Sequence, residues 1–347
     1  MDPVSETAAH FTDTKLKHRR GPPGRHKNQY LQSPDPSLTE DPMPLSPNPY
    51  AALKEASQYV RLFRGKTFVV KVGGEILAEP KIRKALCEQI ALLWSFSIQV
   101  VVVHGGGAEL DAVCASMNIP VEKVAGRRVT SPEVLGAAKM VFAGQVHMDL
   151  LAELQGAGVP AVGLTGLDAG LVKAHKRPPV AVIPDGTTEP QLVDYGLVGD
   201  IDAIDPHVLN HLLEGGFVPV VAPLSGGEDG AIYNTNADTI AASLASAIGA
   251  EKLFFLLSVP GLLKDLAKSS SLIPHATLEE LAAFEAKGVI SGGMRPKITA
   301  VKAALTAGVP SAHLVSGLAP DALLAEIFTN EGSGTMIVPG LAVGIAG

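Results

Sequence analysis

The chain has 347 residues, 46% of them hydrophobic, and its 28 Lys and Arg against 35 Asp and Glu leave a formal net charge of −7. This acidic balance argues against bulk binding to nucleic acid or to an anionic membrane, since both favour a basic surface. The two cysteines, Cys87 and Cys114, are too few for a disulfide scaffold or a four-cysteine metal site. No apolar run approaches the ~18 residues of a membrane span. The sequence therefore predicts a cytoplasmic protein with neither nucleic-acid nor membrane partners.

The first 48 residues differ in composition from the rest. They are polar and rich in proline, with a basic stretch at residues 15–27. Such a segment buries too little apolar surface to offset the entropy that ordering would cost. We therefore expect residues 1–48 to form a disordered tail, and residues 340–347 to form a short C-terminal tail.

From residue 49 onward, helical and strand patterns alternate. Apolar spacing predicts a helix at 51–63, and a continuous β-branched run predicts a buried strand at 67–72. Further strands are expected at 99–103, 159–164, 179–183, 217–222, 253–257, 311–315 and 336–338. Further helices are expected at 82–93, 108–118, 133–156, 206–214, 237–248, 278–286, 297–307 and 321–328. This alternation predicts an α/β fold with a mostly parallel sheet and helices on both sides.

Glycine-rich turns follow several of the predicted strands. Gly73-Gly74 follows the strand at 67–72, and Gly105-Gly106-Gly107 follows the strand at 99–103. Glycine lets backbone N–H groups approach an anion, and ligands of parallel sheets bind at the carboxyl ends of strands. An ordinary turn explains any one of these glycines, but the set favours a phosphate-bearing ligand. The P-loop, GxGxxG and GxSxG motifs are missing from the sequence, which disfavours those nucleotide folds and serine-hydrolase chemistry.

Two lysines stand where a positive charge is costly. Lys71 lies in an otherwise apolar strand directly before the glycine pair, where an ammonium group needs water or an anion. Lys297 stands near the start of a predicted helix, where the helix dipole disfavours a cation. A bound phosphate would reverse both costs, although an edge strand in water would also explain Lys71.

Two further polar segments are candidates for ligand contact. Asn236 and Asp238 suit the cap and first turn of the helix at 237–248, which leaves Asn234 free to face a ligand. Arg127 and Arg128 are suited to clamp a carboxylate. A pair of arginines exposed to solvent fits the sequence about equally well.

A set of segments occurs in a fixed order: KVGG, HGGG, GRRVT, TGLDAG, NTNAD, GAEKLFFLLSVPG, GGMRPK and EIFTNEGSGTMI. With these segments, from about residue 51 to residue 339, the chain resembles the amino acid kinase family. The resemblance implies a three-layer αβα sandwich with a kinase domain at 66–339. Its N-terminal lobe, about 66–224, would hold an acyl amino acid, and its C-terminal lobe, about 225–339, would hold ATP with Mg²⁺. The implied reaction transfers the γ-phosphoryl group of ATP to the side-chain carboxylate of N-acetyl-L-glutamate, in arginine biosynthesis.

The resemblance also implies roles for individual residues. Lys71 and Lys297 would flank the transferring phosphoryl group, and Asp238 would organise both lysines. The positions implied for substrate binding are Gly105, Gly106, Arg128 and Asn234. The positions implied for phosphate or nucleotide binding are Gly73, Gly74, Ser258, Gly261 and Gly293. No metal ligand is expected from the protein, because Mg²⁺ would arrive with ATP.

The helix at 51–63, followed by RGKT, resembles the N-terminal helix of arginine-inhibited members of the family. Residues 49–65 are therefore expected to be an oligomerisation element, which gives a homodimer or a hexamer built as a trimer of dimers. Glu331, Gly332 and Gly334 match a region near the inhibitor site, which implies free arginine as an effector. The alternative is a helix that only packs on the sheet.

Four positions depart from the family pattern. Ser258 stands where an aspartate near the nucleotide is common, Leu167 replaces a lysine, Ala169 replaces a glycine and His147 replaces an asparagine. These changes lie in the nucleotide lobe and in flanking helices, and they leave both lysines in place.

Two other hypotheses stay open. One is a kinase that acts on a related acidic amino acid such as N-acetyl-aminoadipate. The other is a weakly catalytic, arginine-sensing regulatory protein on the same fold. The presence of Lys71, Asp238 and Lys297 argues against the second, because a pure sensor needs no pair of lysines at a phosphate site.

Overall fold

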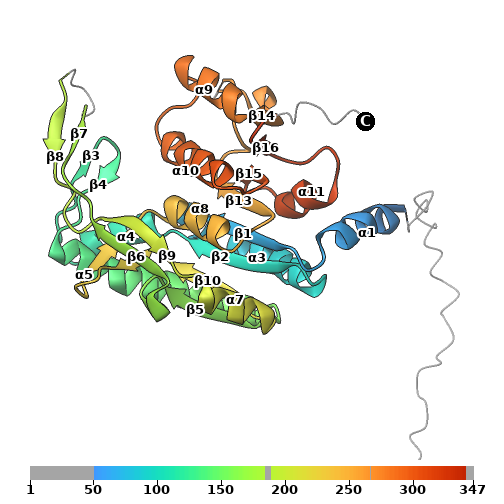
Figure 1. Cartoon of the computed structure of the whole chain (residues 1–347), viewed down its shortest axis with the longest axis horizontal. Helices are drawn as coiled ribbons and strands as arrows, with labels where there is room; N and C mark the ends of the chain where they lie inside the picture. The colour runs from blue at the N-terminus through green and yellow to red at the C-terminus, as the bar shows by residue number, and fades with distance from the viewer. Residues whose placement is uncertain (1–50, 184–188, 266, 341–347) are drawn as a thin grey trace, which may run out of the picture. The chain divides into compact units, whose positions relative to one another are not determined.

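An eight-stranded sheet forms the centre of the protein in the computed structural model, which describes residues 51–183, 189–265 and 267–340 (Figure 1). In spatial order its strands are β14 (His275–Thr277), β16 (Thr335–Val338), β15 (Ser311–Ser316), β13 (Lys252–Leu257), β1 (Thr67–Val72), β2 (Gln99–His104), β10 (Val218–Ala222) and β5 (Ala161–Thr165). Neighbouring strands are parallel except β15 and β16, which are antiparallel. The predicted α/β class with a mostly parallel sheet is confirmed.

Helices cover both faces of this sheet and complete the three predicted layers. One face packs against α1 (Ala51–Phe63), α2 (Gly74–Leu77), α3 (Pro80–Ser95), α4 (Gly107–Ser116), α5 (Pro132–Met140), α6 (Val146–Gly156) and α11 (Ala322–Phe328). The other face packs against α7 (His207–Glu214), α8 (Ala237–Ala247), α9 (Leu278–Ala286) and α10 (Met294–Thr306). Within the described ranges no helix is long and apolar enough to cross a bilayer.

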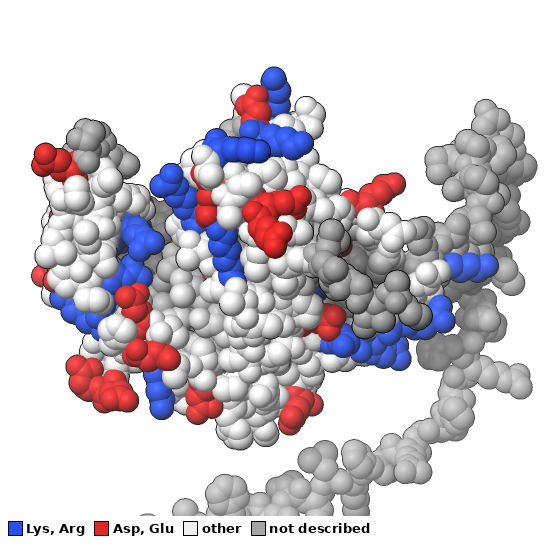
Figure 2. Space-filling model, turned by 45° about the horizontal axis from the view of Figure 1, so that its top comes forward, with Lys and Arg blue, Asp and Glu red and all other residues white. Residues whose placement is uncertain are grey.

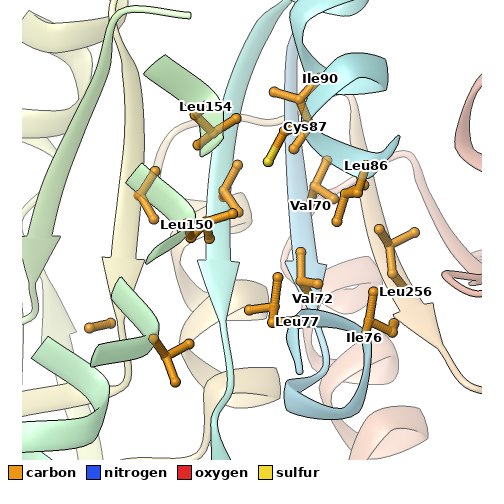
Figure 3. Close-up of a cluster of buried hydrophobic side chains, with 14 of the residues drawn as sticks. Val70, Val72, Ile76, Leu77, Leu86, Cys87, Ile90, Leu150, Leu154 and Leu256 are labelled. Carbon is orange, nitrogen blue, oxygen red and sulfur yellow. The ribbon is translucent and has the colours of Figure 1, made fainter. Parts of the chain in front are cut away.

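The alternation of β1 side chains decides which face each residue serves. Val70 and Val72 point into the core beneath α3 and α6, where side chains of both helices meet the sheet (Figure 3). Val69 belongs to the opposite core, together with residues of α8 and α10. Lys71 shares the parity of Val69, so its side chain leaves the sheet toward α8 and α10. Each fully buried aliphatic side chain contributes about 1.5–3 kcal/mol, which fixes this register.

A second, four-stranded sheet was not predicted. It consists of β12 (Ile232–Asn234), β11 (Leu224–Gly226), β6 (Val172–Lys176) and β9 (Gly199–Ile204). Two hairpins accompany it: β3 (Lys123–Val124) with β4 (Arg127–Arg128), and β7 (Val180–Val182) with β8 (Gln191–Val193). The strand expected at 179–183 is thus a hairpin strand outside the central sheet. These strands are short and partly exposed, so their sequences lack a continuous apolar run.

The long helix expected at 133–156 contains a π-helical turn, η1 (Val141–Gln145), between α5 and α6. Two short 3₁₀ turns, η2 (Asp168–Gly170) and η3 (Ser269–Ser271), connect other elements. The helices expected at 51–63 and 278–286 have the predicted bounds.

The predicted domain division extends beyond what the structure describes. The tail at residues 1–48 lies outside the described residues, as does the C-terminal tail except for Gly340. From Tyr50 onward the chain groups into one unit. The division into lobes at about 224/225 therefore stays a prediction.

Candidate active site

An ion-paired centre joins three side chains from different elements. Lys71 Nζ lies 2.8 Å from Asp238 Oδ1, and Lys297 Nζ lies 3.3 Å from Asp238 Oδ2. Lys71 lies near the end of β1, and Asp238 lies in the first turn of α8. Lys297 is the fourth residue of α10. The structure therefore brings together the three residues that the sequence singled out for phosphoryl transfer.

The cap of α8 places the carboxylate of this centre. The Asn236 side chain accepts hydrogen bonds from the backbone N–H groups of Asp238 and Thr239, at 2.8 and 3.1 Å. This confirms the predicted cap and fixes the first turn of the helix. Asp238 is 4% exposed and Lys71 is 6% exposed. The cap thus aims a buried carboxylate at the sheet face from which Lys71 emerges.

The charges of the centre do not cancel. Burial acts to raise the pKa of Asp238, but the ammonium groups of Lys71 and Lys297 outweigh it and hold that pKa below its ordinary value. One carboxylate between two ammonium groups leaves one positive charge in a partly dehydrated setting. Such a surplus attracts an anionic ligand more strongly than it would in water. Figure 2 shows basic side chains on both sides of a hollow in this part of the molecule.

Two glycine turns meet beside this centre. Val72 and His104 are paired in register, so the turns that follow β1 and β2 leave the sheet side by side. A Cβ atom on Gly74 would lie 3.0 Å from Gly106 Cα, and one on Gly105 would lie 3.3 Å from Gly74 N. A side chain at either position would crowd the facing turn, and the close approach places backbone N–H groups at the carboxyl edge of the sheet. The phosphate- and substrate-binding roles expected of Gly73, Gly74, Gly105 and Gly106 stay predictions.

A cavity of about 370 Å³ opens at the same edge, and all four predicted substrate residues line it. Arg128 Nη1 donates to Asp111 Oδ1, and its Nη2 donates to Gly107 O at 2.9 Å. These bonds use part of the guanidinium fork and hold it at the cavity wall. Asn234 Nδ2 donates to Thr130 Oγ1 at 3.1 Å. Its Oδ1 can accept a hydrogen bond from a ligand.

Three residues that the sequence analysis did not select also line the cavity: Phe142, Arg177 and Tyr195. Phe142 lies in the π-helical turn, and Arg177 follows β6 and is held by Asp200 through bonds of 2.9 and 2.6 Å. Tyr195 is buried and donates to Val124 O at 3.1 Å. No sequence pattern marked these positions, because the second sheet and the π turn that place them were not predicted.

The predicted nucleotide positions farther along the chain occupy different environments. Ser258 is exposed after β13, and Gly293 is exposed at the cap of α10, where a Cβ atom would meet open space. Gly261 is buried, and a Cβ atom there would fall 2.7 Å from Thr335 Oγ1 and 2.8 Å from Leu272 Cδ1. Packing alone therefore explains Gly261. The nucleotide roles of these three residues stay predictions.

A second cavity, of about 190 Å³, lies between α1 and the C-terminal segment. The predicted effector residues Glu331, Gly332 and Gly334 line it. Other lining residues include Tyr59, Phe63, Lys252, His313, Glu326 and Asn330.

Within this wall the side chains form a chain of hydrogen bonds. Lys252 Nζ lies 3.1 Å from His313 Nε2, and His313 Nδ1 lies 2.7 Å from Glu326 Oε1. Burial raises and His313 lowers the pKa of Glu326, which lies below its ordinary value overall.

Known proteins share both sequence and fold with this chain. An acetylglutamate kinase from Myxococcus xanthus is 65% identical over 296 residues, which cover 85% of this chain and 96% of that protein. An acetylglutamate kinase from Symbiobacterium thermophilum is 41% identical over 288 residues, covering 83% and 97%.

A solved structure of N-acetylglutamate synthase from Neisseria gonorrhoeae, complexed with coenzyme A and N-acetyl-glutamate, superimposes with a TM-score of 0.72 at 30% identity, covering 84% of this chain and 63% of that one. The same synthase complexed with coenzyme A and L-arginine gives a TM-score of 0.68 at 27% identity, covering 84% and 66%.

The family profile described as "Amino acid kinase family" matches residues 66–316. That range contains the ion-paired centre, both glycine turns and the larger cavity. The match covers more than half of the chain, and the curated relatives span nearly its whole described part. The chain therefore belongs to the amino acid kinase family.

Proposed function

We propose that this protein phosphorylates the side-chain carboxylate of N-acetyl-L-glutamate with ATP, giving N-acetyl-L-glutamyl 5-phosphate and ADP in arginine biosynthesis. The names of its relatives support the substrate. The observation that carries the chemistry is the Asp238 carboxylate held between Lys71 and Lys297 beside two glycine turns.

The reaction needs no general base from the protein. A substrate carboxylate is already ionised near pH 7. Its oxygen attacks the γ-phosphorus, and the bond from that phosphorus to the oxygen bridging the β- and γ-phosphates breaks as ADP leaves. The obstacle is repulsion between the two anions, which positioning and positive charge overcome.

The residues of the centre match that demand. Asp238 holds one ammonium group at each of its two carboxylate oxygens. The two ammonium groups can therefore contact different oxygens of one phosphoryl group. The N–H groups of Gly74 and Gly106 supply further donors at the sheet edge. Both Asp238 oxygens face lysines, which agrees with Mg²⁺ arriving on the nucleotide, where it would neutralise phosphate charge.

The larger cavity supports a small acyl amino acid as the acceptor. Arg128 has further guanidinium N–H groups, beyond those bonded to Asp111 and Gly107, that can donate to a carboxylate, and Asn234 offers an amide oxygen to an N–H group. A volume of about 370 Å³ also accommodates one more methylene group, so N-acetyl-aminoadipate remains the second candidate.

The second cavity supports free arginine as an effector. It combines the exposed carboxylate of Glu331, the ammonium group of Lys252 and the aromatic rings of Tyr59 and Phe63. An α-amino acid with a cationic side chain presents complementary groups of both signs. If arginine at millimolar concentration leaves the rate of acyl-phosphate formation unchanged, this part of the proposal is wrong.

We further propose that the protein is cytoplasmic and assembles as a homodimer or as a hexamer through α1. Leu62 on this helix is 63% exposed, which an interface would explain. Light scattering on wild type and on Leu62→Glu tests the assembly. A smaller mass for the variant is expected, and an equal mass contradicts a role for this face.

A hydroxylamine-coupled acyl-phosphate assay with MgATP tests the proposed reaction. It compares N-acetyl-L-glutamate, N-acetyl-aminoadipate, glutamate and aspartate at equal concentration. We expect hydroxamate from N-acetyl-L-glutamate above all. Product from N-acetyl-aminoadipate instead would keep the mechanism and change the substrate. The absence of product from every acid would favour the regulatory protein.

A further inference from the structure

Two buried imidazole rings lie directly behind the glycine turn that follows β2. His104 ends β2 and is 0% exposed, whereas His147 lies in the first turn of α6 and is 5% exposed. His104 Nε2 is 2.9 Å from His147 Nδ1, and His104 Nδ1 is 2.8 Å from Gly105 O. The rings therefore form a hydrogen-bonded relay that ends on the backbone of the turn.

The chemistry of the partners fixes where the protons lie. A carbonyl oxygen only accepts, so His104 Nδ1 carries the proton that bonds to Gly105 O. Burial lowers the pKa of both rings, so His104 and His147 are neutral and carry one ring proton each. His104 Nε2 is then an acceptor, and His147 Nδ1 must donate to it. Both rings are Nδ1–H tautomers.

This relay sets the direction of a backbone donor. Because a trans peptide is planar, its carbonyl oxygen and the next N–H group point in opposite directions. The bond from His104 to Gly105 O therefore turns the Gly106 N–H group away from the imidazole pair. On the other side of the residue, Gly105 N–H donates to Val72 O at 2.9 Å. A Cβ atom on Gly74 would lie 3.1 Å from Gly106 N, so this donor lies where the two glycine turns meet.

We propose that His147 is a positioning residue for phosphoryl transfer: its Nδ1–H group orients His104, which aims the Gly106 amide at the bound anion. The inference rests on the proposed function for its effect on rate. The donor at Nδ1, rather than the imidazole as such, is what the relay needs.

The geometry of residue 147 supplies a matched pair of substitutions. In asparagine the amide nitrogen is bonded to Cγ, as Nδ1 is in histidine, so Asn at this position can place a donor at the same point. Leucine fills similar volume without a donor. Space beyond the ring is closed, since a Cβ atom on Gly163 would fall 2.3 Å from His147 Nε2. His147→Asn therefore keeps the relay, and His147→Leu breaks it.

The first test is kinetic. His147→Leu should lower kcat about tenfold or more, because a misdirected N–H donor stabilises the transition state less. The KM values should change less than about threefold, because substrate binding depends less on this donor. His147→Asn should restore kcat to within about threefold of wild type. His211→Asn, an exposed histidine on α7, is the control and should change neither constant. An unchanged kcat in a folded His147→Leu protein, or equal losses in the Leu and Asn variants, would overturn the proposal.

The second test needs no activity. Nitrogen-15 spectra of the histidine rings should show Nδ1–H tautomers for His104 and His147, with resonances assigned through the variants. The Gly106 amide resonance should shift in His147→Leu and stay near its wild-type position in His147→Asn. An Nε2–H tautomer for His104, or an unmoved Gly106 amide in His147→Leu, contradicts the inference. If wild type makes no acyl phosphate from any acid, the proposed function fails, and these spectra still decide whether His147 orients His104 and the Gly106 amide.

Discussion

Two buried carboxylates in this protein are held in different ways. Asp238 is held by two ammonium groups, Lys71 and Lys297, which leave a surplus of positive charge. Glu326 is held by His313 and by the backbone N–H groups of Ser333 and Gly334, at 2.7 and 2.9 Å. The first arrangement leaves cationic donors for a ligand, whereas the second satisfies its carboxylate within the protein. The contrast indicates a reaction centre at Asp238 and a structural tie at Glu326, where a loop is fastened to α11.

The largest expected effect comes from neutralising Asp238. Asp238→Asn should lower kcat by about 10²–10³-fold, because both lysines lose the anion that positions them against the phosphoryl group. The measurement is kcat at saturating ATP and acceptor, with Asp202→Asn as a control, since Asp202 is exposed and pairs with His175. Retention of more than a tenth of the wild-type kcat by a folded Asp238→Asn protein would contradict the assignment.

Neutralising Glu326 should act on stability instead. Glu326→Gln removes the charge that His313 and two backbone amides share, which should cost about 1–3 kcal/mol of unfolding free energy. Urea unfolding measures the loss, and kcat without arginine should fall far less than in Asp238→Asn. An unchanged unfolding midpoint in urea would show that the tie is weaker than its geometry implies.

Acid should destabilise the protein through buried histidines in both regions. Burial lowers the pKa of His313 despite Glu326, and burial lowers the pKa of His104 to about 4. An unfolded histidine binds its proton near pH 6.5. Because the unfolded chain then binds more protons, stability should fall as the pH drops from about 6.5 toward 4. The pKa values of Asp238 and Glu326 lie below their ordinary values, so both carboxylates stay charged through most of this range.

Unfolding free energies of wild type and His313→Asn at pH 7 and pH 5 test this expectation. The variant should lose less stability than wild type on acidification, since it has no buried imidazole at that position to protonate. A loss of stability equal to that of wild type would show that the group whose protonation destabilises the protein lies outside the second cavity.

The smallest expected effect lies at the rim of the second cavity. Glu331 is exposed, so Glu331→Gln should change stability by less than about 0.5 kcal/mol. If Glu331 contacts the effector, half-inhibition should need up to about fivefold more arginine, the value of an exposed ion pair. Inhibition curves of variant and wild type provide the measurement, and superimposable curves would place the effector elsewhere in the cavity.

The parts that sequence predicts best are those whose local pattern and tertiary role agree. The strand at Thr67–Val72 is buried on both faces and reads as a continuous apolar run, in which Lys71 stands out for a chemical reason. The Asn236 cap is likewise a local property. These signals, together with the ordered motifs, were enough to predict the three residues of the ion-paired centre.

The parts that sequence missed depend on pairings made far along the chain. Arg177 reaches the larger cavity through the pairing of β6 with β9, which contains an irregularity between Lys173 and Ala174. Phe142 reaches it through a π-helical turn, whose extra residue has no periodic signature. The His104–His147 contact joins residues 43 positions apart, and only the packing of α6 on the sheet reveals it.

The most direct test of the reaction centre compares two lysines close together in sequence. Lys71 is buried against Asp238, whereas Lys66 is half exposed and pairs with Glu251 at 3.1 Å. Acyl-phosphate formation from N-acetyl-L-glutamate and MgATP should fall by about 10²-fold or more in Lys71→Ala and stay within about twofold of wild type in Lys66→Ala. Equal rates in the two folded variants would contradict the claim that the Lys71–Asp238–Lys297 centre transfers the phosphoryl group.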